Sequence, residues 1–224
     1  MGVYRRSREG AWKSIDIRSK YAATAVLIPT PDGSVWARYS GGTLFRLKGD
    51  AIEDFSGSDP RIGDITLIRP HAQGLIFGGE GGLSLFDGRK FHSLSALDEP
   101  VLNVVTGISQ SKDGSTWIFT QAGVLRLQTE NLTSALLNSD AKSLRYQLID
   151  SRDGLPGAPY GAVYGSSVAT GSDGRVWFTT GQGLAWIDPN NLYRNPLAPP
   201  LDILSLSTPD REYSAKSALA LAAG

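Results

Sequence analysis

The sequence contains no cysteine, which excludes disulfide bonds, thiolate nucleophiles and cysteine-based metal sites. It carries as many basic as acidic residues, 22 of each, so it has no excess of positive charge to attract nucleic acid or an anionic membrane surface. Its longest mostly apolar stretch, residues 22–28, is far shorter than the ~20 residues that span a bilayer. We therefore expect no nucleic-acid partner and no membrane contact. The lack of cysteine fits the cytosol and the periplasm equally.

Histidine is also scarce, because His71 and His92 are the only two in the chain. They fall at different positions of the pattern described below, and no carboxylate pair recurs near them. A metal centre or a Ser-His-Asp relay needs several convergent side chains. We therefore expect no catalytic residue, no metal and no cofactor, and an ordinary polar role for each histidine. The glycine-rich segment 78–82 precedes a strand pattern rather than a helix, so it predicts a turn and not a phosphate loop.

Glycine, by contrast, is abundant, with 26 residues, and it recurs in phase. An Asp-Gly or Gln-Gly pair, then two further residues and an aromatic residue, occurs at 32–36, 73–77, 113–117 and 173–177. The spacing is roughly 40 residues, with one longer step. A second glycine series keeps the same spacing, and its members are Gly2, Gly42, Gly82, Gly123 and Gly183. A period of about 40 residues without helical pattern is typical of propeller blades.

Each repeat divides into four short strands. In the first complete copy we expect them at 24–28, 35–39, 42–47 and 51–55, with the Asp-Gly turn between the first two. The fold class is therefore all-β, a β-propeller of about four blades of four antiparallel strands, either a small ring or a fragment of a larger one. Three blades are complete over residues 22–149.

The two ends of the chain predict partial units. Residues 2–6 and 12–16 match a third and a fourth strand, so the chain starts within a blade. We expect residues 1–196 to form the propeller blades, and residues 197–224 to form a linker and the first strands of a truncated β-sandwich domain. The long step places extra residues at 130–143 and 150–160, which we interpret as loop expansions because neither contains the glycine-aromatic pattern.

The repeated turn glycines and aromatic residues have a structural role in this interpretation. The aromatic side chains could instead stack against a sugar, but a residue repeated at one strand position usually packs between blades. We expect all eight in the framework: Gly33, Trp36, Gly74, Phe77, Gly114, Trp117, Gly174 and Trp177.

The fullest copy of the pattern, Asp-Gly-x-x-Trp-x-x-Thr-x-x-Gly-Leu-x-x-x-Asp at 173–188, resembles the two-component regulator propeller repeat. The segment 188–203 resembles the junction between the last blade and the tyrosine-rich β-sandwich of that family. Gln73 and Phe77 depart from the pattern, and the family usually has more blades. The resemblance implies a non-enzymatic sensor domain of a two-component signalling protein, located in the periplasm with its parent anchored in the inner membrane. It also implies that the domain binds a small solute or glycan, or forms a homodimer.

Propeller geometry predicts where a ligand would bind. The loops from the second to the third strand, and from the outer strand to the next blade, emerge on one face. Polar and aromatic residues on these loops suit a neutral, hydroxyl-rich solute. The candidate ligand-binding residues are Tyr39, Arg61, Glu80, Gln121, Arg152, Asp153, Tyr160 and Gln182.

Two alternative functions remain open. The strand at 177–179 also resembles that of streptogramin-lyase propellers, which favours a propeller enzyme of the lyase or lactonase type. Such an enzyme would need a central metal or a histidine base. The other alternative is a protein-interaction propeller, although the Gly-His and Trp-Asp markers of the best-known examples are missing.

Overall fold

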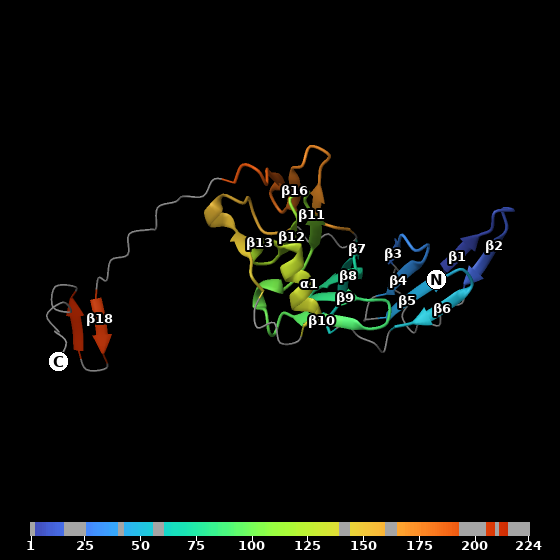
Figure 1. Ribbon diagram of the computed structural model, residues 1–224, viewed down its shortest axis with the longest axis horizontal. Coiled ribbons are helices and arrows are strands. Elements are labelled where there is room, and N and C mark those ends of the chain that lie inside the picture. The colour runs from blue at the N-terminus through green and yellow to red at the C-terminus, as the bar shows by residue number, and fades with distance from the viewer. Residues whose placement is uncertain are drawn as a thin grey trace. The chain divides into compact units, whose positions relative to one another are not determined.

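The computed structural model describes residues 3–15, 26–39, 43–55, 61–138, 144–159, 165–192, 205–208 and 211–214 (Figure 1). The chain divides into two units, Met1–Asn191 and Leu192–Gly224. In the second unit, β18 (Ser205–Thr208) and β19 (Arg211–Ser214) form an antiparallel hairpin. Among the described residues, no helix is both long and apolar enough to cross a bilayer.

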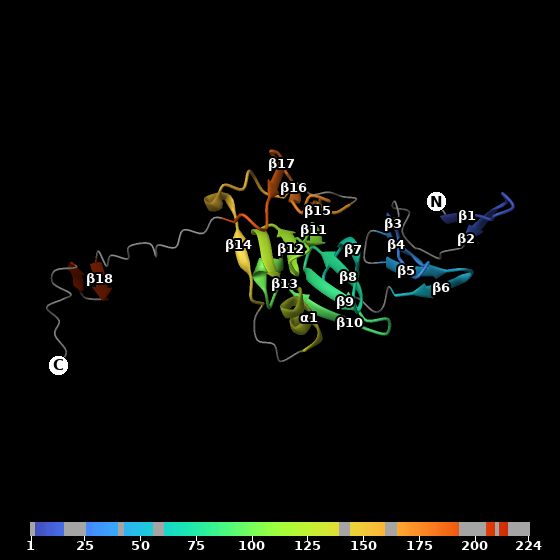
Figure 2. The ribbon, with the colours of Figure 1, turned by 45° about the horizontal axis from the view of Figure 1, so that its top comes forward.

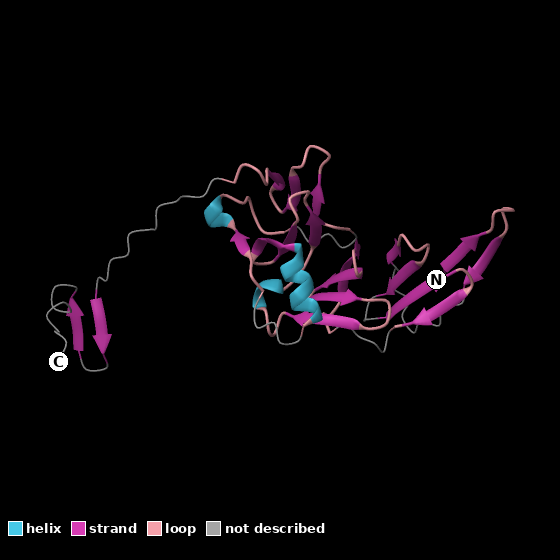
Figure 3. Cartoon of the chain, viewed as in Figure 1, coloured by secondary structure: helices cyan, strands magenta, loops and turns pink. Residues whose placement is uncertain are grey.

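The first unit is built from antiparallel sheets in which each strand pairs with its neighbour in the chain, and the strands dominate Figure 3. Blade 1 contains β3 (Val26–Pro29), β4 (Val35–Tyr39), β5 (Thr43–Lys48) and β6 (Ala51–Asp54). Blade 2 contains β7 (Ile65–His71), β8 (Gly74–Gly79), β9 (Gly82–Phe86) and β10 (Phe91–Ser95). Blade 3 contains β11 (Gly107–Gln110), β12 (Ser115–Thr120), β13 (Gly123–Gln128) and β14 (Gln147–Ile149).

Two smaller sheets flank these blades in the chain. Blade 4 has three described strands, β15 (Val168–Thr170), β16 (Val176–Thr180) and β17 (Gly183–Ile187). The amino-terminal hairpin consists of β1 (Val3–Arg6) and β2 (Trp12–Ile15). The predicted all-β propeller architecture, with three complete blades, is therefore confirmed.

The Asp-Gly turns form because the aspartate caps its own turn. Oδ1 of Asp113 accepts a hydrogen bond from the Ser115 backbone N–H at 3.1 Å, and Asp32 and Asp173 make the same contact in blades 1 and 4. The following glycine has a positive φ, +80° at Gly114. An aspartate can bond to the backbone two residues on, and glycine adopts positive φ without a steric cost. In blades 1, 3 and 4 the repeated dipeptide thus determines where the first strand turns into the second.

The aromatic residues of the repeat lie where expected in three blades. Trp36, Phe77 and Trp117 are fully buried. Trp177 differs, since it is only partly buried and its ring centroid lies 6.3 Å from that of Trp186, which is about half exposed. A partner sheet covers the aromatic residues of blades 1 to 3, whereas among the described elements blade 4 has a neighbouring sheet on one side.

One prediction about the long step is wrong. The segment interpreted as a loop expansion contains a helix, α1 (Thr129–Leu137), which contacts β9, β10, β12 and β13 (Figures 1 and 3). Leu132, Ala135 and Leu136 form its buried face, within the aliphatic cluster of blades 2 and 3. Short 3-10 turns occur at η1 (Pro100–Leu102) and η2 (Ser151–Asp153). The helix forms because this apolar face covers the junction between the two blades.

The junction between blades 3 and 4 is joined by hydroxyl groups. The first strands β11 and β15 lie side by side (Figure 2). The hydroxyls of Thr106 and Ser167 share a hydrogen bond of 2.7 Å, and those of Ser109 and Thr170 share one of 2.8 Å. The Ser167 backbone N–H also donates to the Thr106 carbonyl. These bonds place β11 and β15 beside each other at one wall of the site described next.

Candidate functional site

Two of the loops on which we expected a ligand, the β8–β9 and β12–β13 turns, contact the neighbouring connections between blades. The backbone N–H of Glu80, in the β8–β9 turn, donates to the Asp64 carbonyl, and the Glu80 carbonyl accepts from Val104. In the next blade, Oε1 of Gln121 accepts a hydrogen bond from Asn103 at 2.8 Å. The second-to-third strand turns of blades 2 and 3 therefore contact the connections between blades, as propeller geometry predicts.

The individual candidates on these loops differ in setting. Tyr39 is only 4% exposed and packs against Phe45, and burial raises the pKa of its hydroxyl. Arg61 and Gln182 are exposed. Arg152 is exposed and bonds to Asp150 through two nitrogens, while Asp153 accepts from the Asp150 backbone N–H. Tyr160 lies outside the described residues. A ligand role for this set stays a prediction.

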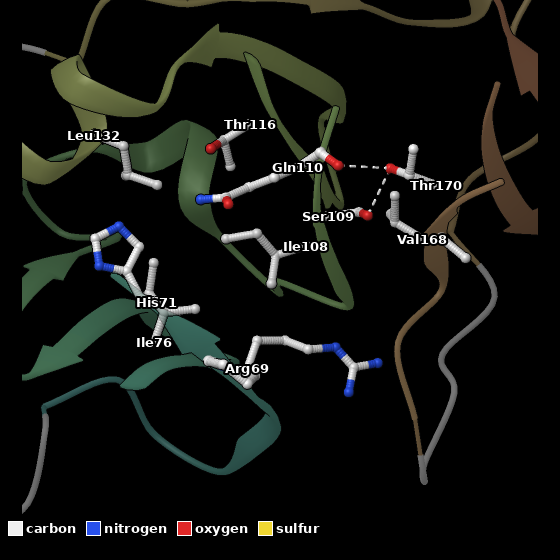
Figure 4. A pocket seen from close by; sticks show the side chains of 12 residues that line it. Arg69, His71, Ile76, Ile108, Ser109, Gln110, Thr116, Leu132, Val168 and Thr170 are labelled. Carbon is white, nitrogen blue, oxygen red and sulfur yellow. Dashed lines mark hydrogen bonds between the residues drawn. The ribbon is translucent and has the colours of Figure 1, made fainter. Parts of the chain in front are cut away.

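A cavity of about 320 Å³ lies at the opposite end of the strands, where blades 2, 3 and 4 meet α1 (Figure 4). We call it the seam pocket. Its volume is at the lower end of the range for small-molecule sites, about 300–1,000 Å³. Its lining residues are Arg69, Pro70 and His71 of β7, Ile76 of β8, Ile108, Ser109 and Gln110 of β11, Thr116 of β12, Leu132 of α1, and Val168, Ala169 and Thr170 of β15.

Most hydroxyl groups of the seam pocket are paired within the protein. The Thr170 hydroxyl donates to the Gln110 carbonyl at 2.9 Å and also bonds to Ser109, as the dashed lines of Figure 4 show. The Thr116 hydroxyl bonds to that of Thr129 at 2.8 Å. The guanidinium of Arg69 and the side-chain amide of Gln110 make no hydrogen bond to any other residue that the structure describes. These two groups are therefore available to a ligand.

His71 lines the pocket with a defined tautomer. Its Nδ1 accepts a hydrogen bond from the Gln73 backbone N–H at 3.3 Å, so the ring proton is on Nε2. Nε2 lies 3.2 Å from the Thr133 hydroxyl, which itself donates to the Thr129 carbonyl at 2.8 Å. Burial lowers the pKa of His71, which favours the neutral ring. Both ring nitrogens are thus engaged, and the imidazole positions α1 against β7.

A second cavity of about 270 Å³ lies between blades 1 and 2, and Pro70 and His71 line both cavities. Its other lining residues include Asp32, Trp36 and Arg46. The pKa of the Asp32 carboxyl is well below its usual value, chiefly because the hydroxyls of Ser34 and Thr30 donate to it. Within the described part of the chain, no three His, Asp or Glu side chains are grouped as metal ligands would be.

Sequence reasoning did not select Arg69 or Gln110. It placed the ligand on the other loops, and it assigned His71 an ordinary polar role, which its hydrogen bonds match. One signal was available, because Arg69 is a charged residue within an otherwise uncharged first strand of a blade. In the strand register the other blades have Pro29, Gln110 and Thr170 at this position, so the charge of Arg69 is specific to blade 2 and indicates a local role beyond packing.

No family model matches this chain, and no curated protein matches it. Among solved structures, it is similar to the extracellular domain of the one-component system BT4673 from B. thetaiotaomicron, with 16% identity, a TM-score of 0.59 and coverage of 77% of this chain. It is also similar to the extracellular domain of the hybrid two-component system BT3049 from the same organism, with 17% identity, a TM-score of 0.55 and coverage of 84% of this chain. A third similar structure is a virginiamycin B lyase from Staphylococcus aureus, solved with quinupristin. It has 16% identity, a TM-score of 0.53 and coverage of 85% of this chain.

The chain spans only part of each of these proteins, namely 25% and 28% of the two extracellular domains and 61% of the lyase. At such low identity the likeness concerns the fold and leaves the activity open. Together with the four-stranded antiparallel sheets, it shows that the chain folds as β-propeller blades.

Proposed function

We propose that this chain is a non-enzymatic extracytoplasmic sensor domain of a two-component signalling protein, and that it binds a small solute in the seam pocket. The observation that carries the proposal is the pocket itself, a cavity of ligand size where three blades and a helix meet. The resemblance of the repeat, and the structural likeness to extracellular domains of signalling systems, support the sensor role. Residues 197–224, with the β18–β19 hairpin, are proposed to begin the next domain.

The chemistry of the pocket supports binding without turnover. A general base must be able to accept a proton from a bound substrate. Both nitrogens of His71 are already engaged, Nδ1 by Gln73 and Nε2 by Thr133. None of the described residues that line the pocket carries a carboxylate. The remaining polar groups are hydrogen-bond donors and acceptors suited to recognition.

Thermal unfolding in the presence of a library of small sugars and organic acids tests the binding site. A ligand that binds only the folded chain raises Tm as its concentration rises. Ala169→Trp fills the pocket from its exposed edge and should abolish the Tm rise for the binding compound. Ala122→Trp, an equally exposed change in the β12–β13 turn at the other end of the strands, is the matched control. Loss of binding in the control alone would move the site to the opposite loops.

The absence of cysteine provides a test of location. Leu97→Cys introduces a single thiol at a side chain that is 92% exposed, and Ala135→Cys places one in the buried face of α1. In intact producing cells, a maleimide that cannot cross the inner membrane should label the first variant and spare the second. Labelling of Leu97→Cys only after lysis would contradict an extracytoplasmic location.

The lyase alternative is favoured by the resemblance of the strand at 177–179 and by the structural likeness to two lyases of this class, each of which covers 85% of this chain. Quinupristin incubated with the purified chain and divalent cations, followed by mass spectrometry, separates the two functions. We expect the compound to stay intact. A product of ring opening would overturn the non-enzymatic assignment.

A further inference from the structure

We propose that the seam pocket selects solutes that carry a carboxylate group next to a hydroxyl-bearing ring, such as a uronic acid. This inference rests on the proposed function, because it names the chemical class of the solute. It modifies the expectation of a neutral ligand that the sequence suggested. The observation that supports it is the net charge of the side chains that line the pocket.

Among the twelve described residues that line the pocket, one has an ionised side chain, Arg69. None of these twelve is an aspartate or glutamate, and burial lowers the pKa of His71, which favours the neutral ring. Arg69 is exposed, and its guanidinium has no ion pair with another described residue. The pocket therefore presents a single unneutralised positive charge, which matches a monoanion better than a neutral molecule or a dianion.

The arrangement of the side chains separates this charge from the other available polar group. In Figure 4, the Arg69 guanidinium extends from β7 toward the side where Ser109 and Val168 lie. The Gln110 amide points to the opposite side of Ile108, toward Leu132 and His71. A ligand that reaches both groups must have an anionic end and, across an apolar middle, an atom that bonds to an amide.

The chemistry of each group narrows the ligand class. A guanidinium matches the two oxygens of a carboxylate with parallel N–H bonds. An amide both donates and accepts, which suits a ring hydroxyl. Ile108, Ile76 and Leu132 offer an apolar surface to the carbon face of a ring. A uronic acid combines these three features in a molecule small enough for the cavity.

The test compares D-galacturonate with D-galactose, which has a hydroxymethyl group in place of the carboxylate. Both are titrated into the intact chain by calorimetry, with a parallel titration followed by nuclear magnetic resonance. We expect galacturonate to bind about tenfold more tightly, as one partly exposed charge-assisted contact allows. High salt should weaken galacturonate binding and leave galactose binding unchanged.

Two variants assign the preference to one residue. Arg69→Gln removes the charge and keeps an amide, so the affinities for the two sugars should become equal. Arg8→Gln makes the same change at an exposed arginine of the β1–β2 turn and should leave the preference intact. Circular dichroism checks that both variants keep their sheet structure, as expected at exposed positions.

The remaining outcomes separate this inference from the proposed function. Equal affinities in the unaltered chain, or a preference that survives Arg69→Gln, would overturn the carboxylate inference while solute binding stands. If neither sugar binds, propionate serves as the minimal carboxylate probe. Failure of propionate to perturb the resonances of residues lining the pocket would overturn the inference, whatever the compound library shows about other solutes.

Discussion

At the scale of residues, equivalent positions of the repeat have different hydrogen-bonding environments. In blade 3, Nε1 of Trp117 donates to the Ser111 hydroxyl at 2.8 Å. In blade 1, the residue corresponding to Ser111 is Thr30, whose hydroxyl bonds to Asp32 and Ser34 but accepts no bond from Trp36. Nε1 of Trp36 is buried and has no partner among the described residues. A buried polar group without a partner is costly to the folded state.

This difference predicts unequal effects of the same substitution. Trp117→Phe removes a buried hydrogen bond, whereas Trp36→Phe removes an unpaired N–H, and both shorten a fully buried ring. We expect Trp117→Phe to lower the free energy of unfolding by about 1 kcal/mol more than Trp36→Phe does. Urea unfolding of the two variants measures the difference. A larger loss for Trp36→Phe would show that its indole N–H has a bonding partner in solution.

Asp113 makes the stability of the turn in blade 3 dependent on pH. Burial raises the pKa of this carboxyl, but hydrogen bonds from Ser111, Ser115 and Arg126 outweigh it and hold the pKa at about 2, against 3.8 for an unperturbed aspartate. The ionised form is therefore favoured in the folded chain. Its stabilisation is present above pH 3.8 and is lost as the pH falls toward 2.

Asp113→Asn should abolish that part of the pH dependence. After allowance for solvent screening, we expect the variant to be about 1 to 2 kcal/mol less stable than the unaltered chain at neutral pH, with the gap closing in acid. Unfolding free energies measured from pH 2 to 7 provide the check, with the exposed Asp98→Asn as control. A gap that stays constant with pH would assign the loss to packing alone.

At the scale of elements, the sequence predicted the strands well because a local signal starts each one. The Asp-Gly or Gln-Gly turns and the second glycine series mark the succession of strands in every blade, and neither depends on distant contacts. The helix α1 was missed because its signal is short, nine residues without a side-chain N-cap. The spacing of Leu132, Ala135 and Leu136 fits one helical face. That face stabilises a helix only because it packs against the aliphatic cluster of blades 2 and 3.

The same reasoning explains why the seam pocket was not predicted. It forms between blades, from side chains that lie far apart in the sequence, such as Arg69, Gln110 and Thr170. The repeat indicates which residues occupy equivalent positions within a blade. It carries no information on the width of the junction between two blades, which depends on the side chains packed there.

A core role for α1 predicts a large effect from one truncation. Leu132 is only 1% exposed and lies in the aliphatic cluster, so Leu132→Ala should lower the free energy of unfolding by about 2 to 4 kcal/mol. Leu97→Ala, at a side chain that is 92% exposed, should change it by less than about 0.5 kcal/mol. Chemical unfolding followed by circular dichroism compares them. Equal small effects would mean that the helix does not pack on the blades.

At the scale of the whole molecule, the junctions between blades use different combinations of contacts. Blades 1 and 2 meet through an aromatic cluster in which the rings of Trp36 and Phe77 lie edge to face, 5.2 Å apart. Blades 2 and 3 share the aliphatic cluster with α1. Blades 3 and 4 share the hydroxyl pairs at β11 and β15, and Phe178 of blade 4 packs against Trp117 and Phe119 of blade 3. The seam pocket lies where the second and third of these junctions meet.

Blade 4 also leaves a sheet edge open within the described part of the chain. There β17 pairs with β16 alone, and it exposes Leu184 by 70% and Trp186 by 48%. An apolar strand with an unpaired edge is a template for pairing with another chain. We therefore propose that the propeller unit self-associates through β17. The first species to form as the concentration rises is a homodimer.

Light scattering across a concentration series measures this association. The mass of the unaltered chain should rise from monomer toward dimer with concentration. Leu184→Lys places a charge on the exposed edge and should shift the transition to higher concentration by tenfold or more, because like charges would then face each other across the contact. Leu97→Lys makes the same change at an exposed leucine outside any sheet edge and should leave the transition in place. A monomer at every concentration, or equal shifts in the two variants, would remove β17 as the contact.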